Sequence, residues 1–148
     1  MHKAIAGLAV VGALLLVVTG CGSDDSSLSK QEYDQQLELV CNQGLQEREE
    51  LLEDVGREFE ERQRQTDPDF QASSIRRLIA IYDGTTDEIA DLGLPDQGEQ
   101  KAEELVQARE DAAAKVEADP LGSREKLVPI FSKANKVAEE LEAKSCAT

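Results

Sequence analysis

Glycine and proline divide the chain beyond residue 29 into four segments, and each segment repeats apolar residues every three or four positions. Glu, Gln, Leu, Ala and Lys dominate these segments, whereas runs of β-branched residues are missing from them. The common residue types favour helices, and the spacing places the apolar ones on a single helical face. The pattern therefore predicts an all-α domain.

The first segment carries a helix start signal and a long apolar face. Ser29 precedes Glu32 by three residues, which is the spacing of a capping box, and Leu28 and Tyr33 are placed as a hydrophobic staple. Leu39 falls off the apolar side of this helix. The predicted apolar side comprises Tyr33, Leu37, Val40, Cys41, Leu51, Leu52, Val55 and Phe59.

The second and third segments differ in apolar content. Asp67 and Pro68 are typical of a helix N-cap and first position, and Gly93 and Pro95 are typical of a helix end. The broad apolar face between them predicts the most buried helix of the domain. The third helix, about residues 97–118, has few large apolar residues, so we expect it to be mostly exposed.

The fourth segment contains Pro129 near its beginning, which predicts either a bend or a helix start later than Ser123. Four helices with short connections favour antiparallel neighbours. The sequence therefore predicts an up-down-up-down four-helix bundle over residues 30–148. In such a bundle the first and fourth helices are neighbours.

The N-terminal segment is typical of an export signal. Residues 4–18 are all apolar or glycine, a run shorter than the roughly 18 to 25 residues of a membrane span. The sequence Val18-Thr19-Gly20-Cys21 follows and resembles the lipobox of bacterial lipoproteins.

That resemblance implies a signal peptide over residues 1–20, cleavage before Cys21, and a diacylglycerol thioether on Cys21. Residues 21–29 then form a short polar tether, and the domain is anchored by lipid to the outer, extracytoplasmic face of the cell membrane. The alternatives are a soluble secreted protein with an incidental Cys21 and an uncleaved signal anchor.

Charge and residue types exclude several functions. The net charge is −15, and it becomes −16 without residues 1–20 because that segment holds Lys3 and no acid. The chain has no basic stripe, so we expect no nucleic-acid partner. The only histidine, His2, lies in the signal, which argues against His-based catalysis and His-containing metal sites. We therefore expect no enzymatic activity, no cofactor and no metal.

Cys41 and Cys146 are the two cysteines that remain when Cys21 is lipidated. In the predicted topology the end of the fourth helix returns beside the first part of the first helix. Outside the cytoplasm such a pair is usually oxidised, so we predict a Cys41–Cys146 disulfide. A buried Cys41 with a free terminal thiol is the main alternative, and two thiolates without a third ligand make a poor zinc site.

Taken together, these features resemble a family of small actinobacterial lipoproteins. Its members join a lipobox and a Ser/Asp-rich tether to motifs like "YDQQLELVCNQ", "DEIADLGLPDQGEQ" and "AEELEAKSCAT", here at residues 33–43, 87–100 and 138–148. Many relatives carry CxxAN in the first motif, whereas here Asn42 follows Cys41 directly. The resemblance implies a disulfide-linked helical bundle outside the cytoplasmic membrane and no established activity.

Two arginines are candidates for a ligand site. Arg48 and Arg109 fall on the apolar sides of the first and third helices, where a guanidinium can bind a phosphate or a carboxylate. The alternative is that each pairs with a nearby glutamate. The segment "DGTTDE", residues 83–88, has calcium-type ligands but not the spacing of an EF-hand, so we expect a solvated helical turn.

These observations favour a non-catalytic binding or interaction module. A second hypothesis is a carrier of lipid or another small apolar ligand, with space left by Gly44, Gly56 and the alanine-rich third helix. A third is a structural envelope protein. An internal apolar cavity of several hundred Å³ favours the carrier, whereas a filled core with an exposed apolar patch favours a protein partner.

Overall fold

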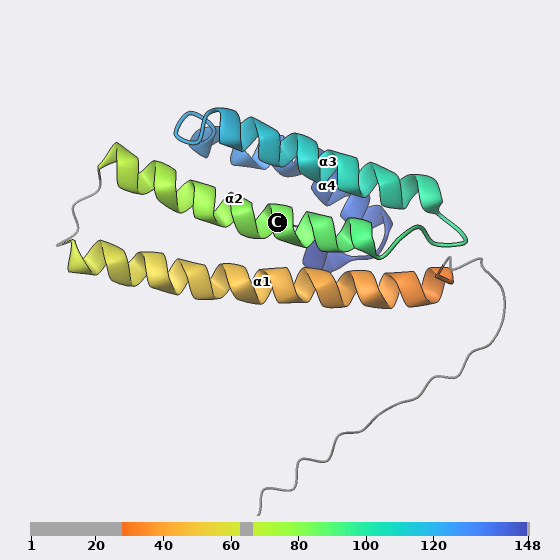
Figure 1. Ribbon diagram of the computed structural model, residues 1–148. Helices are drawn as coiled ribbons and strands as arrows, with labels where there is room; N and C mark the ends of the chain where they lie inside the picture. The colour runs from red at the N-terminus through yellow and green to blue at the C-terminus, as the bar shows by residue number, and fades with distance from the viewer. Residues whose placement is uncertain (1–27, 63–66, 148) are drawn as a thin grey trace, which may run out of the picture.

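The computed structural model describes residues 28–62 and 67–147, which form four α-helices that run antiparallel in succession (Figure 1). This architecture confirms the predicted all-α four-helix bundle. The predicted signal peptide, most of the tether and Cys21 lie outside the described residues. The helices are α1 (Lys30–Glu61), α2 (Pro68–Asp91), α3 (Glu99–Ala118) and α4 (Leu127–Glu140), with short 3-10 helices η1 (Arg124–Lys126) and η2 (Lys144–Cys146).

The predicted helix boundaries are largely confirmed. The Ser29 hydroxyl accepts from the Glu32 backbone N–H, and the Glu32 carboxylate accepts from the Ser29 backbone, which completes the capping box. The Ser29 hydroxyl also donates to the Glu32 carboxylate at 2.6 Å, and this bond, together with the one from the Ser29 backbone N–H, lowers the pKa of Glu32. At α2 the Asp67 carboxylate accepts from the Phe70 N–H at 2.7 Å. Gly93 follows α2 with a φ of 76°, a left-handed conformation that favours glycine.

The start of α4 follows the second of the two predicted alternatives. The helix begins at Leu127, so Pro129 lies in its first turn, where an N–H has no intrahelical acceptor to lose. Residues before Leu127 form η1 instead. As a result α4 has 14 residues against 32 in α1, and it cannot follow α1 along its length.

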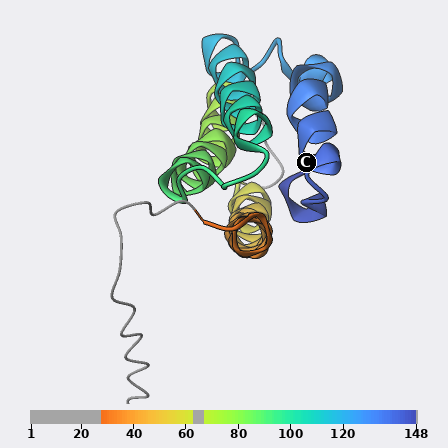
Figure 2. The same cartoon turned by 90° about the vertical axis from the view of Figure 1, so that its right-hand side faces the viewer.

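The helices pack in chain order, but the first and fourth do not meet directly. α1 packs on α2, α2 on α3, and α3 on α4. Within the described residues α1 and α4 have no close backbone approach, and η2 lies between them and contacts both (Figure 2). The contact expected between the first and fourth helices is therefore made by η2, which follows α4, and not by α4 itself.

Burial differs from two sequence expectations. α3 buries a larger share of its residues than α2, because α3 lies between α2 and α4 and its alanines allow close packing. Leu52 belongs to the predicted apolar side of α1 but is 50% exposed, whereas the adjacent Leu51 is partly buried. Leu39 is 69% exposed, as predicted.

The core consists of two groups of buried residues. The larger group, called the disulfide cluster below, surrounds the cysteines and takes side chains from all four helices and from η2. The smaller group, the second cluster, lies farther along α2 and α3 and contains Ile79, Tyr82, Ala113 and Val116. The disulfide cluster comprises Tyr33, Leu37, Cys41, Ile89, Ala102, Leu105, Val137, Ala138, Leu141, Ala143 and Cys146.

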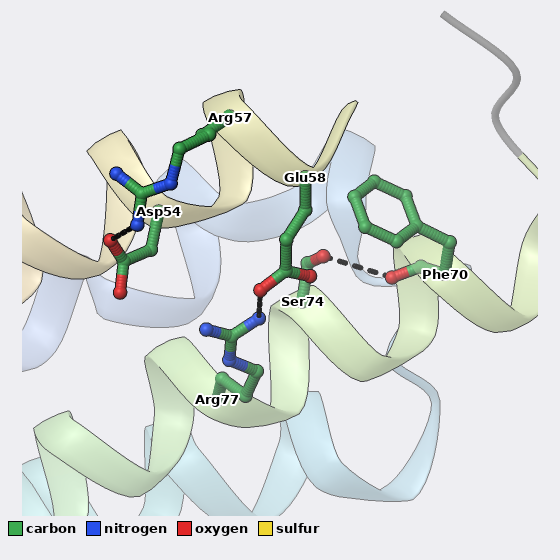
Figure 3. A network of polar contacts seen from close by, with 6 residues as sticks. All are labelled: Asp54, Arg57, Glu58, Phe70, Ser74 and Arg77. Atoms are coloured by element: carbon green, nitrogen blue, oxygen red, sulfur yellow. Dashed lines mark hydrogen bonds and ion pairs between the residues drawn. The ribbon is translucent and has the colours of Figure 1, made fainter. Parts of the chain in front are cut away.

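Charged residues stabilise the far end of the α1–α2 pair, where no core is available. Arg77 of α2 pairs with Glu58 of α1 at 2.7 Å, and both side chains are partly exposed (Figure 3). The Arg62 guanidinium lies 4.8 Å from the centre of the Phe70 ring. Exposed pairs of this kind contribute about 1 kcal/mol or less each. These polar contacts and the contact of Arg62 with the Phe70 ring therefore contribute to holding α1 and α2 together at this end.

A candidate binding cavity between the first and fourth helices

An apolar cavity of about 320 Å³ lies in the middle of the bundle, where α1 and α4 are not in contact. α2 and α3 contribute to one wall, and Cys146 of η2 lines the cavity beside Cys41. Val128 of α4 also lines the cavity and is 83% exposed, so the cavity opens to solvent on the α4 side. Its apolar lining includes Leu45, Ile75, Leu78, Ile79, Val116 and Phe131.

The disulfide explains why the cavity exists beside a filled core. Cys41 and Cys146 form a disulfide with their Cα atoms 4.9 Å apart, and it ties η2 to α1. The Glu38 carboxylate accepts from the Lys144 backbone N–H at 3.0 Å and strengthens the same junction. Because η2 lies between α1 and α4, it separates the two helices, and the space beyond η2 stays unfilled.

Arg109 lies at the wall of the cavity and is almost completely buried. Its side chain is 3% exposed, and Nε donates to the Thr86 hydroxyl at 2.9 Å. The terminal nitrogens donate to the carbonyl oxygens of Cys146 and Tyr82, each at 3.3 Å. Desolvation lowers the pKa of Arg109, while Tyr82 and Asp83 act in the opposite direction. All three hydrogen-bond acceptors are neutral groups.

Tyr82 lies between Arg109 and α4. The Arg109 guanidinium is 3.9 Å from the centre of the Tyr82 ring, and the Phe131 ring packs edge to face on it at 5.0 Å. The Tyr82 hydroxyl is buried and has no hydrogen-bond partner among the described residues. Burial raises the pKa of Tyr82 to about 12, so the hydroxyl keeps its proton at neutral pH and can donate it.

Arg48 lines the cavity from α1. Its Nε is buried, and none of the described residues accepts a hydrogen bond from it. The described residues also form no ion pair with Arg48 or Arg109, although both lie in glutamate-rich segments. The structure thus brings the two sequence-predicted arginines to one cavity, and pairing with nearby glutamates is not observed.

Of the two glycines expected to leave space, Gly44 lines the cavity and Gly56 does not. Gly44 lies against Thr85 of α2, and a Cβ at position 44 would meet the Thr85 hydroxyl, methyl and Cβ atoms. The space is therefore occupied by Thr85, and Gly44 allows α1 and α2 to approach. Gly56 is exposed, and a Cβ at position 56 would meet no atom within 4 Å. The cavity therefore lies where α1 and α4 are apart, and Gly44 and Thr85 form part of its lining.

The segment 83–88 is only partly the solvated turn that we expected. Thr85 and Thr86 are buried and donate to the carbonyl oxygens of Ile81 and Tyr82 one helical turn earlier. Within residues 28–62 and 67–147 no group of three His, Cys, Asp or Glu side chains is placed to hold a metal. Thr86 instead positions Arg109.

Sequence reasoning finds both arginines but not the residues of α2 that surround Arg109. The sequence pattern places Tyr82 on an apolar face and Thr86 in an exposed turn. Their spacing of four puts them on one side of a helix, which is the available signal, but it does not reveal that an arginine of another helix lies there. That arrangement depends on how α2 and α3 pack.

Comparisons with family models, with curated proteins and with solved structures find no match for this chain. The resemblance to actinobacterial lipoproteins therefore stays a prediction. None of the described helices is long and apolar enough to cross a bilayer.

Proposed function

We propose that the domain is a non-catalytic binding module that holds a small apolar ligand in the cavity between α1 and α4. The observation that carries this proposal is the cavity itself, because well-packed cores leave few voids larger than a water molecule. Its volume of about 320 Å³ lies within the range of roughly 300 to 1,000 Å³ that is typical of ligand sites. Its apolar walls and few polar groups also match such sites.

Binding of a neutral fluorescent probe tests this proposal. We expect Nile red to bind the oxidised domain and to be excluded by Leu45→Trp, because Leu45 lines the cavity and a larger side chain fills it. Leu52→Trp is the matched control, since Leu52 lies on the same helix, is 50% exposed and is not among the lining residues. Equal binding by both variants, or no binding by the wild type, contradicts the proposal.

The second part of the proposal concerns location. We infer that Cys21 carries a lipid and that the short tether holds the bundle at the outer face of the cell membrane. The support is the lipobox-like Val18-Thr19-Gly20-Cys21 and the polar segment after it. Partitioning of wild type into a detergent phase, and loss of that partitioning in Cys21→Ser, is the expected result. Equal partitioning of the two chains refutes the anchor.

A protein partner is the alternative function, and the start of α4 favours it. Leu121, Leu127 and Val128 lie close together in sequence and are 41%, 37% and 83% exposed. Exposed apolar residues that gather in one place can mark a binding surface. Native mass spectrometry of the detergent-extracted protein separates the two functions, because a retained small molecule supports the carrier and a retained protein chain supports the interaction module.

A further inference from the structure

We propose that the ligand is a single-chain amphiphile with an anionic head, whose carboxylate or phosphate binds Arg48 while its acyl chain fills the cavity. This inference rests on the proposed function and adds the chemical class of the ligand. It follows from the combination of apolar walls with two arginines that form no ion pair with a carboxylate of the described residues, although Asp83 acts on Arg109 electrostatically from nearby.

Arg48 is the direct contact for the head. It lines the cavity and is partly exposed, so a ligand can reach it from solvent. Its buried Nε lacks an acceptor among the described residues, and an unsatisfied buried donor costs free energy that a ligand oxygen removes. A guanidinium binds carboxylate and phosphate oxygens in a two-pronged geometry, which suits both head groups.

Arg109 supplies a second positive charge next to the same space. It is almost completely buried, and its acceptors are one hydroxyl and two carbonyl oxygens. A buried cation with only neutral acceptors favours the approach of an anion, because low polarity strengthens their attraction. Arg57 and Arg77 differ in this respect, because each pairs with a carboxylate.

Tyr82 adds a donor to the cavity wall. Its side chain is 8% exposed, and its hydroxyl has no partner among the described residues. A head-group oxygen within reach satisfies this hydroxyl. Both polar groups of this cavity that lack partners among the described residues, the Arg48 Nε and the Tyr82 hydroxyl, can donate, which fits an acceptor-rich ligand.

The apolar walls exclude a simple inorganic anion as the intended ligand. Ile75, Leu78 and Phe131 line the space next to the arginines, and such walls favour methylene groups over water. A purely apolar ligand leaves Arg48 and Tyr82 unsatisfied. An acyl chain with an anionic head is the chemistry that matches both parts of the cavity.

Calorimetric titration of the disulfide-bonded domain tests this inference with four probes below their aggregation concentrations: laurate, dodecyl phosphate, 1-dodecanol and inorganic phosphate. We expect laurate or dodecyl phosphate to bind about 10-fold tighter than dodecanol, as a charge-assisted hydrogen bond can provide. The tighter of the two identifies the head group. Inorganic phosphate is expected not to bind measurably.

Arg48→Gln is expected to reduce binding of the anionic probes to the level of dodecanol and to leave dodecanol binding unchanged. Arg76→Gln is the matched control, because Arg76 is exposed, carries the same charge and does not line the cavity. Circular dichroism verifies that both variants fold.

The outcomes separate this inference from the proposed function. If dodecanol and both anions bind equally tightly, the inference of an anionic head is wrong, but the proposed binding of an apolar ligand still stands. Failure of all chain-bearing probes overturns the carrier itself. Inorganic phosphate binding as tightly as dodecyl phosphate overturns the role of the chain, and an equal loss in Arg76→Gln overturns the role of Arg48.

Discussion

The two halves of the bundle core are filled to different degrees. In the disulfide cluster, side chains of all four helices and of η2 pack together, and residues such as Leu37, Leu105 and Ala138 are fully buried. Around the second cluster, α1 and α4 are apart, and the cavity takes the place of side chains. The filled disulfide cluster at one end of the bundle can thus hold α1 and α4 at a distance, and this distance maintains the cavity at the other end.

The two halves also differ in polarity. The disulfide cluster is made of apolar and cysteine side chains together with one tyrosine, whereas the cavity is lined by Arg48, Arg109 and Tyr82, whose hydroxyl has no partner within residues 28–62 and 67–147. Buried polar groups without full partners cost stability. Their concentration beside the cavity indicates that the filled half provides stability and the hollow half provides the ligand site.

Removal of the disulfide is expected to have the largest effect. The bond closes a sequence separation of 105 residues, and the double variant Cys41→Ala/Cys146→Ala should lower the free energy of unfolding by about 3 to 5 kcal/mol. Denaturant unfolding measures this loss, and reduced wild type is the control for the side-chain change. If mass spectrometry of the wild type, purified without a reductant, finds two free thiols, the Cys41–Cys146 assignment is wrong.

Two identical truncations compare the halves directly. Leu37 is 0% exposed in the disulfide cluster, so Leu37→Ala should cost about 3 to 5 kcal/mol, because a new cavity forms in a filled core. Leu78 lines a space that is already open, so Leu78→Ala should cost less than about 2 kcal/mol. Thermal and denaturant unfolding of both variants check the difference. Equal losses would remove the contrast between the halves.

Two glycine substitutions test where α1 approaches α2. Gly44→Ala forces Thr85 to move and should destabilise by about 1 to 3 kcal/mol. Gly56→Ala has open space in the same helix and should stabilise by about 0.5 to 1 kcal/mol through helix propensity. Chemical denaturation distinguishes the two signs. Thr85→Ala in the Gly44→Ala background should recover part of the loss, and no recovery would contradict the assigned contact.

The smallest effect concerns Asp83 beside Arg109. Burial, with repulsion from Glu117 and Asp87, raises the pKa of Asp83 above its ordinary value of 3.8. Its ionisation is therefore less favourable in the folded than in the unfolded state, and its destabilising effect at neutral pH disappears as the pH falls through the raised pKa.

Asp83→Asn should accordingly stabilise by at most about 0.5 kcal/mol at pH 7, because solvent screens the site, and this gain should vanish near pH 3. Unfolding curves across this pH range measure it. Asp91→Asn removes an equal charge from an exposed position of the same helix. A gain of the same size in that control would assign the effect to net charge and not to the surroundings of Asp83.

Local signals in the sequence predict the helices well. Ser29, Asp67 and Gly93 act through hydrogen bonds and backbone angles of their own neighbourhood, so their roles can be read without the fold. The arginines are recognisable because helical periodicity places them on apolar faces. Their lack of carboxylate partners among the described residues is not predictable, since it depends on which glutamates other helices bring close.

Sequence alone is enough to predict the helix count and the caps of α1 and α2, because these depend on residues close in the chain. It also predicts the Cys41–Cys146 disulfide, but through a contact of the first and fourth helices that η2 makes in place of α4. Only the tertiary structure decided that α3 is the most buried helix, that Thr85 fills the space at Gly44, and that η2 separates α1 from α4. The physical reason is that burial and cavities arise from the relative placement of several helices. Helical periodicity specifies which face is apolar, but not what that face packs against.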